Sequence, residues 1–293
     1  MNVRSPTFSL EALAKAFPDF ETIDPDELAP GGFKAVHHAV RSGQEVALKI
    51  IKDPVEGDVS EGATSLPPRF EREIAAMKRL NTPRIVSILD GPATREIDGA
   101  ERLWYLEPYY SGGNLQQRLG VDGAWPRERV LSLYLDLLEA VEEVSRAGLV
   151  HRDIKPLNIV FDDNGRAVLL DLGVALHVDL PTLTASSELA PRTWAFAAPE
   201  QFDTRRDAVF DARTDLFLIG LTVFVAWTNV HPFHPEIPNY VQRLRGGDVD
   251  TRPLETYADD HLAQAVLRML KPELHERFRT PERARYAVMG DGR

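Results

Sequence analysis

The chain has 293 residues, of which 43% are hydrophobic and 27% are charged, and its formal net charge is −11. This length allows two ordinary domains or one larger two-lobed unit with a sizeable core. The acidic balance argues against binding to nucleic acids or to an anionic membrane surface, because both partners require a basic face. The absence of cysteine excludes disulfides, thiolate metal sites and cysteine nucleophiles.

The N-terminal segment 1–20 carries charges and no long apolar core, so it does not resemble a signal peptide, and we expect a cytoplasmic protein. Residues 10–17 have the pattern of a short amphipathic helix, which we expect to form a packed extension over residues 1–19. The most apolar run, 216–227, is too short to span a bilayer and indicates a buried helix.

The next part of the chain is rich in strand signals. Segments 35–40 and 45–51 flank the turn Arg41-Ser42-Gly43-Gln44, which predicts a hairpin. Residues 70–80 repeat apolar side chains with a helical period. Two further strands are predicted at 85–89 and 103–106.

After Gly112-Gly113 the pattern changes. Residues 127–147 form a strongly amphipathic helix, short strands are predicted at 158–161 and 167–170, and the chain from 211 onward is helical or loop-like. Strands followed by helices predict an α+β fold in two lobes. The smaller lobe has an antiparallel sheet with one main helix, and the larger lobe is helical.

The segment His151-Arg152-Asp153-Ile154-Lys155-Pro156-Leu157-Asn158 places an acid, a cation and an amide in one short loop. Such a set can accept a hydroxyl proton, steady a transferring phosphate and hold a metal ion. Asp171-Leu172-Gly173 and Ala198-Pro199-Glu200 follow in the chain. This order of motifs resembles the serine/threonine protein kinases over roughly residues 20–285, and the compact chain resembles soluble bacterial-type members.

The resemblance implies a role for each polar residue of these motifs. Asp153 orients the substrate hydroxyl and accepts its proton, and Lys155 contacts the γ-phosphate of ATP. Asn158 and Asp171 hold Mg²⁺. Lys155, two residues after the acid, is typical of serine/threonine rather than tyrosine kinases, and Arg152 argues against small-molecule kinases, which usually have glycine there.

Lys49 in Val46-Ala47-Leu48-Lys49 matches the family lysine that contacts the α- and β-phosphates. The resemblance gives it Glu73 on the next helix as its partner, in preference to Glu71. Without that resemblance, a lysine near a strand edge usually extends to solvent.

The glycine-rich loop departs from the family pattern. Gly31 keeps the central glycine and is followed by Gly32, whereas Ala29 and Lys34 replace the other two glycines. Glycine permits close backbone approach to phosphates, so the loop has an altered hold on the nucleotide. Lys34 either reaches a phosphate itself or faces solvent. The residues implied to enclose adenine are Val36, Ala47 and Val160.

The segment 103–115 resembles the kinase hinge. An ungapped match places Glu107 at the gatekeeper position, Pro108 next to it, and the N–H of Tyr110 as the second hinge contact. A shift by one residue makes Leu106 the gatekeeper instead. A carboxylate at the back of this pocket needs a partner.

Other matches are architectural or regulatory. Glu200 is expected to pair with Arg277, and Asp215 to anchor the base of the regulatory spine. Residues 174–196 form the expected activation loop. Its candidate phosphorylation sites are Thr182, Thr184, Ser186 and Ser187, while Thr193 is expected to contact Asp153 and Lys155.

The sequence thus predicts an N-terminal extension at 1–19, a kinase N-lobe at 20–107, a hinge at 108–113 and a C-lobe at 114–293, with one kinase domain over 20–285. The expected activity is transfer of the γ-phosphate of ATP, with Mg²⁺, to Ser or Thr hydroxyls of protein substrates, including autophosphorylation. The alternatives are a pseudokinase that binds nucleotide or a protein partner without catalysis, and a small-molecule kinase. The sequence does not predict the oligomeric state.

Overall fold

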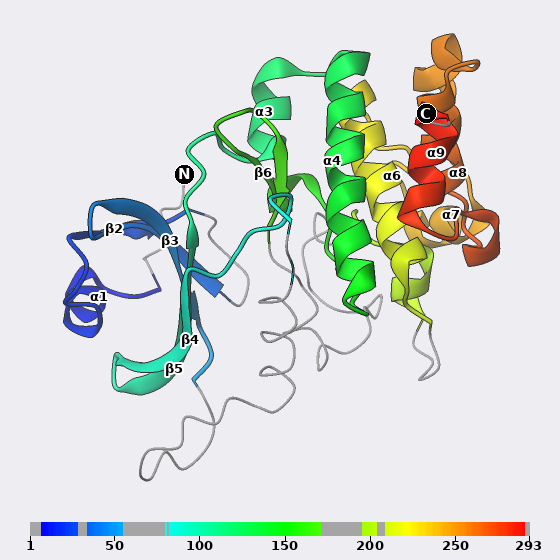
Figure 1. Ribbon diagram of the computed structural model, residues 1–293. Coiled ribbons are helices and arrows are strands. Elements are labelled where there is room, and N and C mark those ends of the chain that lie inside the picture. Colours follow the sequence, from blue (N-terminus) through cyan, green and yellow to red (C-terminus); the bar gives the residue numbers. More distant parts are fainter. Residues whose placement is uncertain are drawn as a thin grey trace. The chain divides into compact units, whose positions relative to one another are not determined.

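The structure, a computed structural model, describes residues 7–28, 34–54, 80, 82–170, 195–203 and 209–290. The chain divides into two compact units (Figure 1). The first comprises Met1–Lys78 and Val86–Ser111, and the second comprises Arg79–Ile85 and Gly112–Arg293. The first holds a five-stranded antiparallel sheet and the second is mainly helical, which confirms the predicted α+β class.

The sheet of the first unit has the strand order β1-β2-β3-β5-β4, and each neighbouring pair is antiparallel. Its strands are β1 (Thr22–Glu27), β2 (Lys34–Arg41), β3 (Gln44–Ile51), β4 (Asp90–Ile97) and β5 (Ala100–Pro108). The predicted β2–β3 hairpin is confirmed, and its turn has positive φ angles at Ser42 (53°) and Gly43 (71°). Two positive φ angles match the turn type that two-residue hairpins favour.

Two strands were not predicted. β1 contains a proline and β4 has few apolar residues, and both lie at edges of the sheet, where proline and polar residues are tolerated. The predicted strand at 85–89 is wrong, because only Ile85 forms an isolated bridge there and β4 begins at Asp90. The dipeptide Asp98-Gly99, with φ angles of 52° and 75°, forms the turn of the β4–β5 hairpin and is a sequence signal that the prediction did not use.

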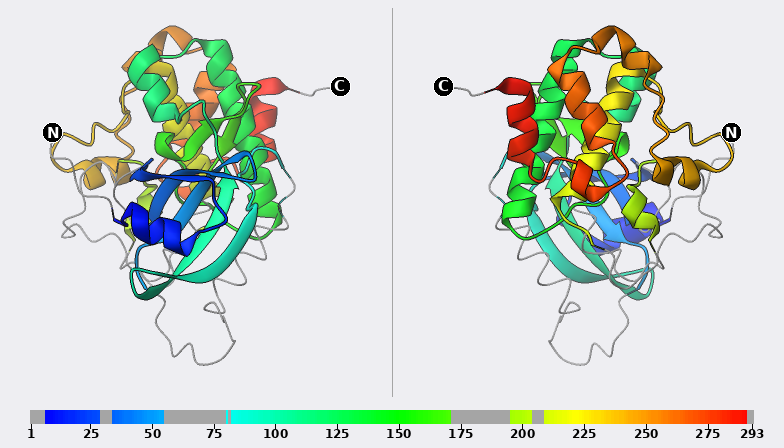
Figure 2. Two further views of the ribbon diagram at one scale, coloured as in Figure 1. Left: turned by 90° about the vertical axis from the view of Figure 1, so that its left-hand side faces the viewer. Right: turned by 90° about the vertical axis from the view of Figure 1, so that its right-hand side faces the viewer.

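The helix α1 (Leu10–Ala16) lies against one face of this sheet (Figure 2). The Ser9 hydroxyl caps it by accepting a hydrogen bond from the Ala12 N–H. Phe8, Leu13 and Phe17 are buried in one cluster with strand residues. The strand residues of that cluster include Ala35, Ala39, Val46, Leu48, Ile50, Trp104 and Leu106. The predicted N-terminal helix is therefore part of the core of this unit.

Arg95 of β4 contacts both this helix and the sheet. Its guanidinium carbon lies 4.8 Å from the ring centre of Phe17 and 4.9 Å from that of Trp104. The same guanidinium donates a 2.7 Å hydrogen bond to the carbonyl of Ala16, at the last residue of α1. The cation–π contacts and the hydrogen bond to the helix C-terminus both stabilise the packing of α1 against the sheet.

The second unit is built on α4 (Arg127–Arg146), which packs against α6 (Ala212–Thr228) and α9 (Pro281–Met289). Within the described residues, the other helices of this unit are α3 (Leu115–Asp122), α7 (Tyr240–Gly246) and α8 (His261–Met269), with 3₁₀ turns at Pro156–Asn158, Pro199–Phe202, Arg252–Tyr257 and Leu274–Glu276. β6 (Ile159–Phe161) and β7 (Ala167–Leu169) form a small hairpin, as predicted. The predicted helix at 127–147 is also confirmed.

The helix α6 is buried on nearly every side, which explains its continuous apolar sequence. It begins at the cap Asp211 and ends at Asn229, which adopts a left-handed conformation with φ of 54°. In the part of the chain that the structure describes, no helix is long and apolar enough to cross a membrane.

Candidate active site

The loop between α4 and β6 carries the acid, cation and amide that the motif predicted. A buried acid of α6, Asp215, holds the start of this loop. Its carboxylate oxygens accept hydrogen bonds of 2.8 Å from the N–H groups of His151 and Arg152. Arg152 has a φ angle of 66°, an uncommon conformation for a residue other than glycine. The two hydrogen bonds therefore fix a strained turn directly before Asp153.

The environment of Asp215 opposes its ionisation. The side chain is fully buried, and burial raises the pKa of Asp215 to about 7, although the two backbone N–H donors favour the charged form. This carboxyl group serves the loop through its hydrogen bonds and is enclosed by protein, so it is a positioning group.

Three side chains meet within the loop. Lys155 Nζ lies 2.7 Å from Asp153 Oδ1, and Asn158 Nδ2 donates to Asp153 Oδ2 at 2.7 Å and to the Asp153 carbonyl at 2.8 Å. Pro156 starts the 3₁₀ turn and brings Asn158 back toward the acid. The side chains of Asp153 and Lys155 remain 27% and 20% exposed, so the carboxylate is oriented by protein and still accessible.

The orientation of Asn158 decides which of its atoms can serve a ligand. Because Nδ2 makes both bonds to Asp153, Oδ1 is the atom that can coordinate a cation. Amide and carboxylate oxygens are the ligands that Mg²⁺ takes from proteins. The donor chemistry of this loop therefore fits a magnesium ion.

The strand that precedes Asp171 is tied to the same loop. The Leu170 N–H donates to the Asn158 carbonyl at 2.8 Å, and His151 Nε2 donates to the Leu170 carbonyl at 3.1 Å. His151 Nδ1 accepts a 3.3 Å hydrogen bond from the Asp153 N–H, which defines the tautomer of the ring. This described range ends at Leu170, and Asp171 itself lies outside the described residues.

In the first unit, the strand register places the predicted residues of β3 and β5 on one face. Ala47 stands opposite Glu107, and Lys49 stands opposite Tyr105. Side chains two residues apart on a strand share a face, so Lys49 and Glu107 are diagonal neighbours. Lys49 Nζ lies 2.6 Å from Glu107 Oε2, and the two side chains are only 3% and 1% exposed.

This arrangement bears on the two alternatives for the gatekeeper. Glu107 lies on the face of Ala47 and Lys49, whereas Leu106 belongs to the apolar cluster under α1 on the opposite face. The carboxylate that required a partner therefore has one in Lys49, a contact that sequence reasoning missed. Pro108 is the last residue of β5, and Tyr110 follows in the connection to the second unit.

The other predicted nucleotide contacts fall in three places. Val36 of β2 stands opposite Lys49, next to Ala47 on the same face of the first unit. Val160 is buried in β6 of the second unit. Gly31, Gly32 and the expected helix acid Glu73 lie outside the described residues, as do the competing Glu71 and Ala29.

Lys34 does not simply extend into solvent. Its Nζ donates a 3.2 Å hydrogen bond to the hydroxyl of Tyr105, a residue that the sequence did not single out. The signal that could have found Tyr105 is strand alternation, because it lies two residues before Glu107 and thus on the same face.

The candidate phosphorylation sites Thr182, Thr184, Ser186 and Ser187 lie outside the described residues, which resume at Ala195. Thr193, which was expected to contact Asp153 and Lys155, lies outside them as well. The Ala195 carbonyl accepts hydrogen bonds from His231 Nε2 at 2.7 Å and from the Tyr240 hydroxyl at 2.9 Å. His231 Nδ1 in turn accepts a 3.2 Å bond from the Phe233 N–H. Burial lowers the pKa of His231 to about 4, which keeps the ring neutral.

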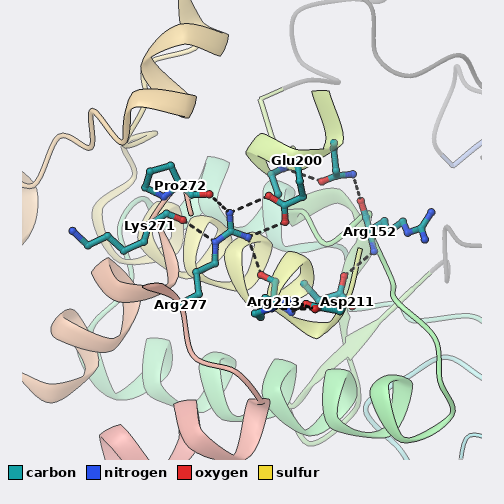
Figure 3. A network of polar contacts seen from close by, with 10 residues as sticks. Arg152, Glu200, Asp211, Arg213, Lys271, Pro272 and Arg277 are labelled. Atoms are coloured by element: carbon teal, nitrogen blue, oxygen red, sulfur yellow. Dashed lines mark hydrogen bonds and ion pairs between the residues drawn. The ribbon is translucent and has the colours of Figure 1, made fainter. Parts of the chain in front are cut away.

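The predicted pair of Glu200 and Arg277 is confirmed and forms the centre of a larger network (Figure 3). Arg277 donates to both Glu200 oxygens, at 2.8 and 3.0 Å. It also donates to the carbonyls of Lys271, Arg213 and Pro272 at 2.7, 3.0 and 2.8 Å. All its N–H groups thus have acceptors, and its side chain is 0% exposed.

The sequence of this chain is similar to a known family and to several curated proteins. The family model described as a protein kinase domain matches residues 25–285. A probable serine/threonine-protein kinase of Streptomyces coelicolor is 32% identical over 214 residues, which cover 72% of this chain and 30% of that protein. Serine/threonine-protein kinase PknL of Mycobacterium tuberculosis is 31% identical over 225 residues, which cover 76% of this chain and 53% of PknL.

Among solved structures, that of Rad53 1-466 in complex with AMP-PNP superposes with a TM-score of 0.69 at 24% identity. The match covers 92% of this chain and 64% of that one, and it supports the two-lobed kinase fold. The chain spans about a third to a half of the two curated relatives named above. Because the family model covers nearly the whole described sequence, this chain belongs to the protein kinase family, and its curated relatives are bacterial serine/threonine-protein kinases.

Proposed function

We propose that this chain is an ATP- and magnesium-dependent protein kinase that transfers the γ-phosphate to Ser or Thr hydroxyls of proteins, its own chain included, in the cytoplasm. The observation that carries the proposal is the geometry around Asp153. Its two carboxylate oxygens are held by Lys155 and Asn158 at 2.7 Å each, while the group stays accessible. A carboxylate held in this way can orient a hydroxyl and accept its proton.

Each residue of the set has a defined part in this reaction. Asp153 aligns the hydroxyl of the substrate and takes its proton, and Lys155, beside it, neutralises charge on the transferring phosphoryl group. Asn158 Oδ1 and the carboxylate of Asp171 are the metal ligands. Magnesium, when bound, offsets the negative charge of the β- and γ-phosphates.

In the first unit, Lys49 with Ala47 and Val36 provides the cation and the apolar surface for the nucleotide, with Pro108 and Tyr110 at the hinge. Glu73 is proposed as a second carboxylate partner of Lys49. The serine/threonine class is supported by Lys155 at two residues after Asp153 and by the names of the bacterial relatives.

Mass spectrometry after incubation with Mg·ATP tests the proposal directly. We expect phosphate on Ser or Thr of the chain itself or of a protein acceptor, and none when EDTA removes magnesium. Thermal unfolding with and without Mg·ATP is measured in parallel. A Mg·ATP-dependent increase in Tm without any phosphate transfer would contradict the enzyme and favour a binding module that lacks catalysis.

A further inference from the structure

One glutamine side chain links the catalytic loop to the segment that follows the expected activation loop. Gln201 lies in the 3₁₀ turn Pro199–Phe202, and its Nε2 donates a 2.9 Å hydrogen bond to the carbonyl of Arg152. Its Oε1 accepts a 2.8 Å hydrogen bond from the Ala198 N–H. A backbone carbonyl can only accept and a backbone N–H can only donate, so these two partners fix the orientation of the amide.

The bond to Ala198 has an ordinary local explanation. Ala198 is the cap residue of the 3₁₀ turn, and a glutamine three residues later commonly returns to the N–H of the cap. The bond to Arg152 is not explained by capping, because the two residues are 49 positions apart in the chain. The donor half of the amide therefore needs an explanation of its own.

The acceptor of that bond is the peptide group that carries Asp153. The carbonyl of Arg152 and the N–H of Asp153 belong to one planar unit. Gln201 donates to the carbonyl end at 2.9 Å, and His151 Nδ1 accepts from the N–H end at 3.3 Å. Arg152 has a φ angle of 66°, and its own N–H donates to Asp215 at 2.8 Å. Because such a backbone conformation persists only where its surroundings impose it, the Gln201 bond is one of the contacts that maintain this turn.

The plane of this peptide group bears on where the Asp153 carboxylate lies. A change in the plane changes the φ angle of Asp153 and with it the direction of the Cα–Cβ bond. The carboxylate oxygens would then move relative to Lys155 Nζ and Asn158 Nδ2, each of which is 2.7 Å away. Small displacements of a reacting group lower the rate strongly, since the reaction requires close alignment.

We propose that Gln201 is a positioning residue of the phosphate transfer. By holding the carbonyl of Arg152, its amide fixes the peptide group from which Asp153 extends. This role rests on the proposed function and adds a residue to its machinery. Gln201 acts through Asp153, so its donor bond contributes to the rate of transfer and not to the binding of ATP.

Gln201→Glu separates the two bonds of the amide, because a carboxylate keeps an acceptor for the Ala198 N–H and loses the donor for the Arg152 carbonyl. Phosphate incorporation into the chain itself and into casein is followed over a range of ATP concentrations. We expect the maximal rate to fall about tenfold, the effect of about one lost hydrogen bond on the barrier, with an unchanged KM for ATP. Gln201→Ala, which removes both bonds, should lose at least as much.

The matched control is Gln264→Ala. Gln264 is an exposed residue of α8, and its Nε2 likewise donates to a backbone carbonyl, that of Ala258, at 3.0 Å. Its removal should change neither the maximal rate nor the KM for ATP. Urea unfolding of all variants under the assay conditions gives the folded fraction by which each rate is corrected.

The pH dependence of Gln201→Glu provides a readout that a loss of stability does not produce. When the introduced carboxyl binds a proton, it again has an O–H donor for the Arg152 carbonyl. A carbonyl oxygen opposes the charged form, so this proton is bound at a higher pH than by a free carboxyl. The maximal rate of Gln201→Glu relative to wild type should therefore rise as pH is lowered from 8 to 6, whereas the relative rate of Gln201→Ala should stay constant.

Three results would overturn this role and leave the proposed function intact. They are a wild-type maximal rate in Gln201→Glu after correction for the folded fraction, a raised KM for ATP in place of a slower maximal rate, and a relative rate of Gln201→Glu that does not vary with pH. The first would show that Gln201 only caps its turn. A wild-type protein that phosphorylates neither itself nor casein would overturn the proposed function as well.

Discussion

Two clusters of acids and cations in the helical unit differ in the sequence separation of their partners and in their exposure to solvent. In the catalytic loop, Asp153 is bound by residues two and five positions away, and its side chain is accessible. In the network of Arg277, the partner Glu200 is 77 residues away, and each N–H of the buried guanidinium has an acceptor. Local spacing with accessible polar atoms marks chemistry, whereas long-range saturation marks architecture.

The ion pair of Lys49 and Glu107 belongs to neither type. It is buried like the architectural network, yet it lies on the sheet face that carries the proposed nucleotide residues. Substitutions that change activity but not stability, or stability but not activity, therefore test the distinction between catalytic and architectural clusters.

The largest effect is expected at Asp153. Asp153→Ala should lower phosphate transfer by about 10³- to 10⁴-fold, because it removes the group that orients the hydroxyl and accepts its proton. The free energy of unfolding should change by only about 1 kcal/mol, since the lost hydrogen bonds are partly exposed. Labelled phosphate incorporation and urea unfolding measure the two quantities.

Asp163→Ala, at an exposed turn position of the same unit, is the matched control for Asp153→Ala. It should change neither phosphate transfer nor the free energy of unfolding. Full activity in Asp153→Ala would contradict the role given to this carboxylate.

Glu200→Gln, in contrast to Asp153→Ala, should act mainly by lowering the free energy of unfolding. Arg277 would remain buried without a compensating charge, and removal of one partner of a buried pair costs about 3–5 kcal/mol. Urea unfolding should reveal this loss, while Glu273→Gln, an exposed acid of the same region, should lie within about 0.5 kcal/mol of wild type. A small effect of Glu200→Gln would show that the network is replaceable.

His231 makes the stability of the second unit depend on pH. Its pKa is about 4 in the folded chain and near 6.5 when unfolded, so the unfolded state binds more protons between these values. Stability is therefore lost as pH falls through this range, by about 3 kcal/mol in total and about 2 kcal/mol at pH 5.

The physical cause is that protonation of Nδ1 would set a donor against the Phe233 N–H. Urea unfolding from pH 7.5 to 4.5 should be less pH-dependent in His231→Gln than in wild type. Parallel pH profiles for the two proteins would rule this explanation out.

The smallest effect is expected at the intermediate case. Glu107→Gln keeps the shape and an acceptor but removes the charge that faces Lys49. It should cost about 2 kcal/mol of stability, less than Glu200→Gln, because a buried lysine, unlike an arginine, can lose its proton when the opposite charge is removed. Glu45→Gln, an exposed acid of the same sheet that pairs with His38, should be nearly neutral. Unchanged stability together with an unchanged KM for ATP in Glu107→Gln would show that the pair supports neither the fold of this unit nor the binding of the nucleotide.

The sequence was sufficient where structure depends on local spacing. The loop from His151 to Asn158, the helix α4 and the β2–β3 hairpin all follow from patterns within about twenty residues. It was insufficient where a contact depends on strand register. The approach of Glu107 to Lys49, and of Lys34 to Tyr105, becomes visible only when β2, β3 and β5 are aligned. The strands β1 and β4 were missed because edge strands need little apolar alternation.

The helix α1 has a practical consequence for anyone who produces this protein in shortened form. The family match starts at residue 25, yet Phe8, Leu13 and Phe17 fill the apolar layer between α1 and the sheet. A recombinant fragment trimmed to the family limits would lose this layer and present Leu48, Ile50 and Leu106 to water. A fragment that retains the residues from position 7 onward should aggregate less and is the better choice for crystallisation and screening.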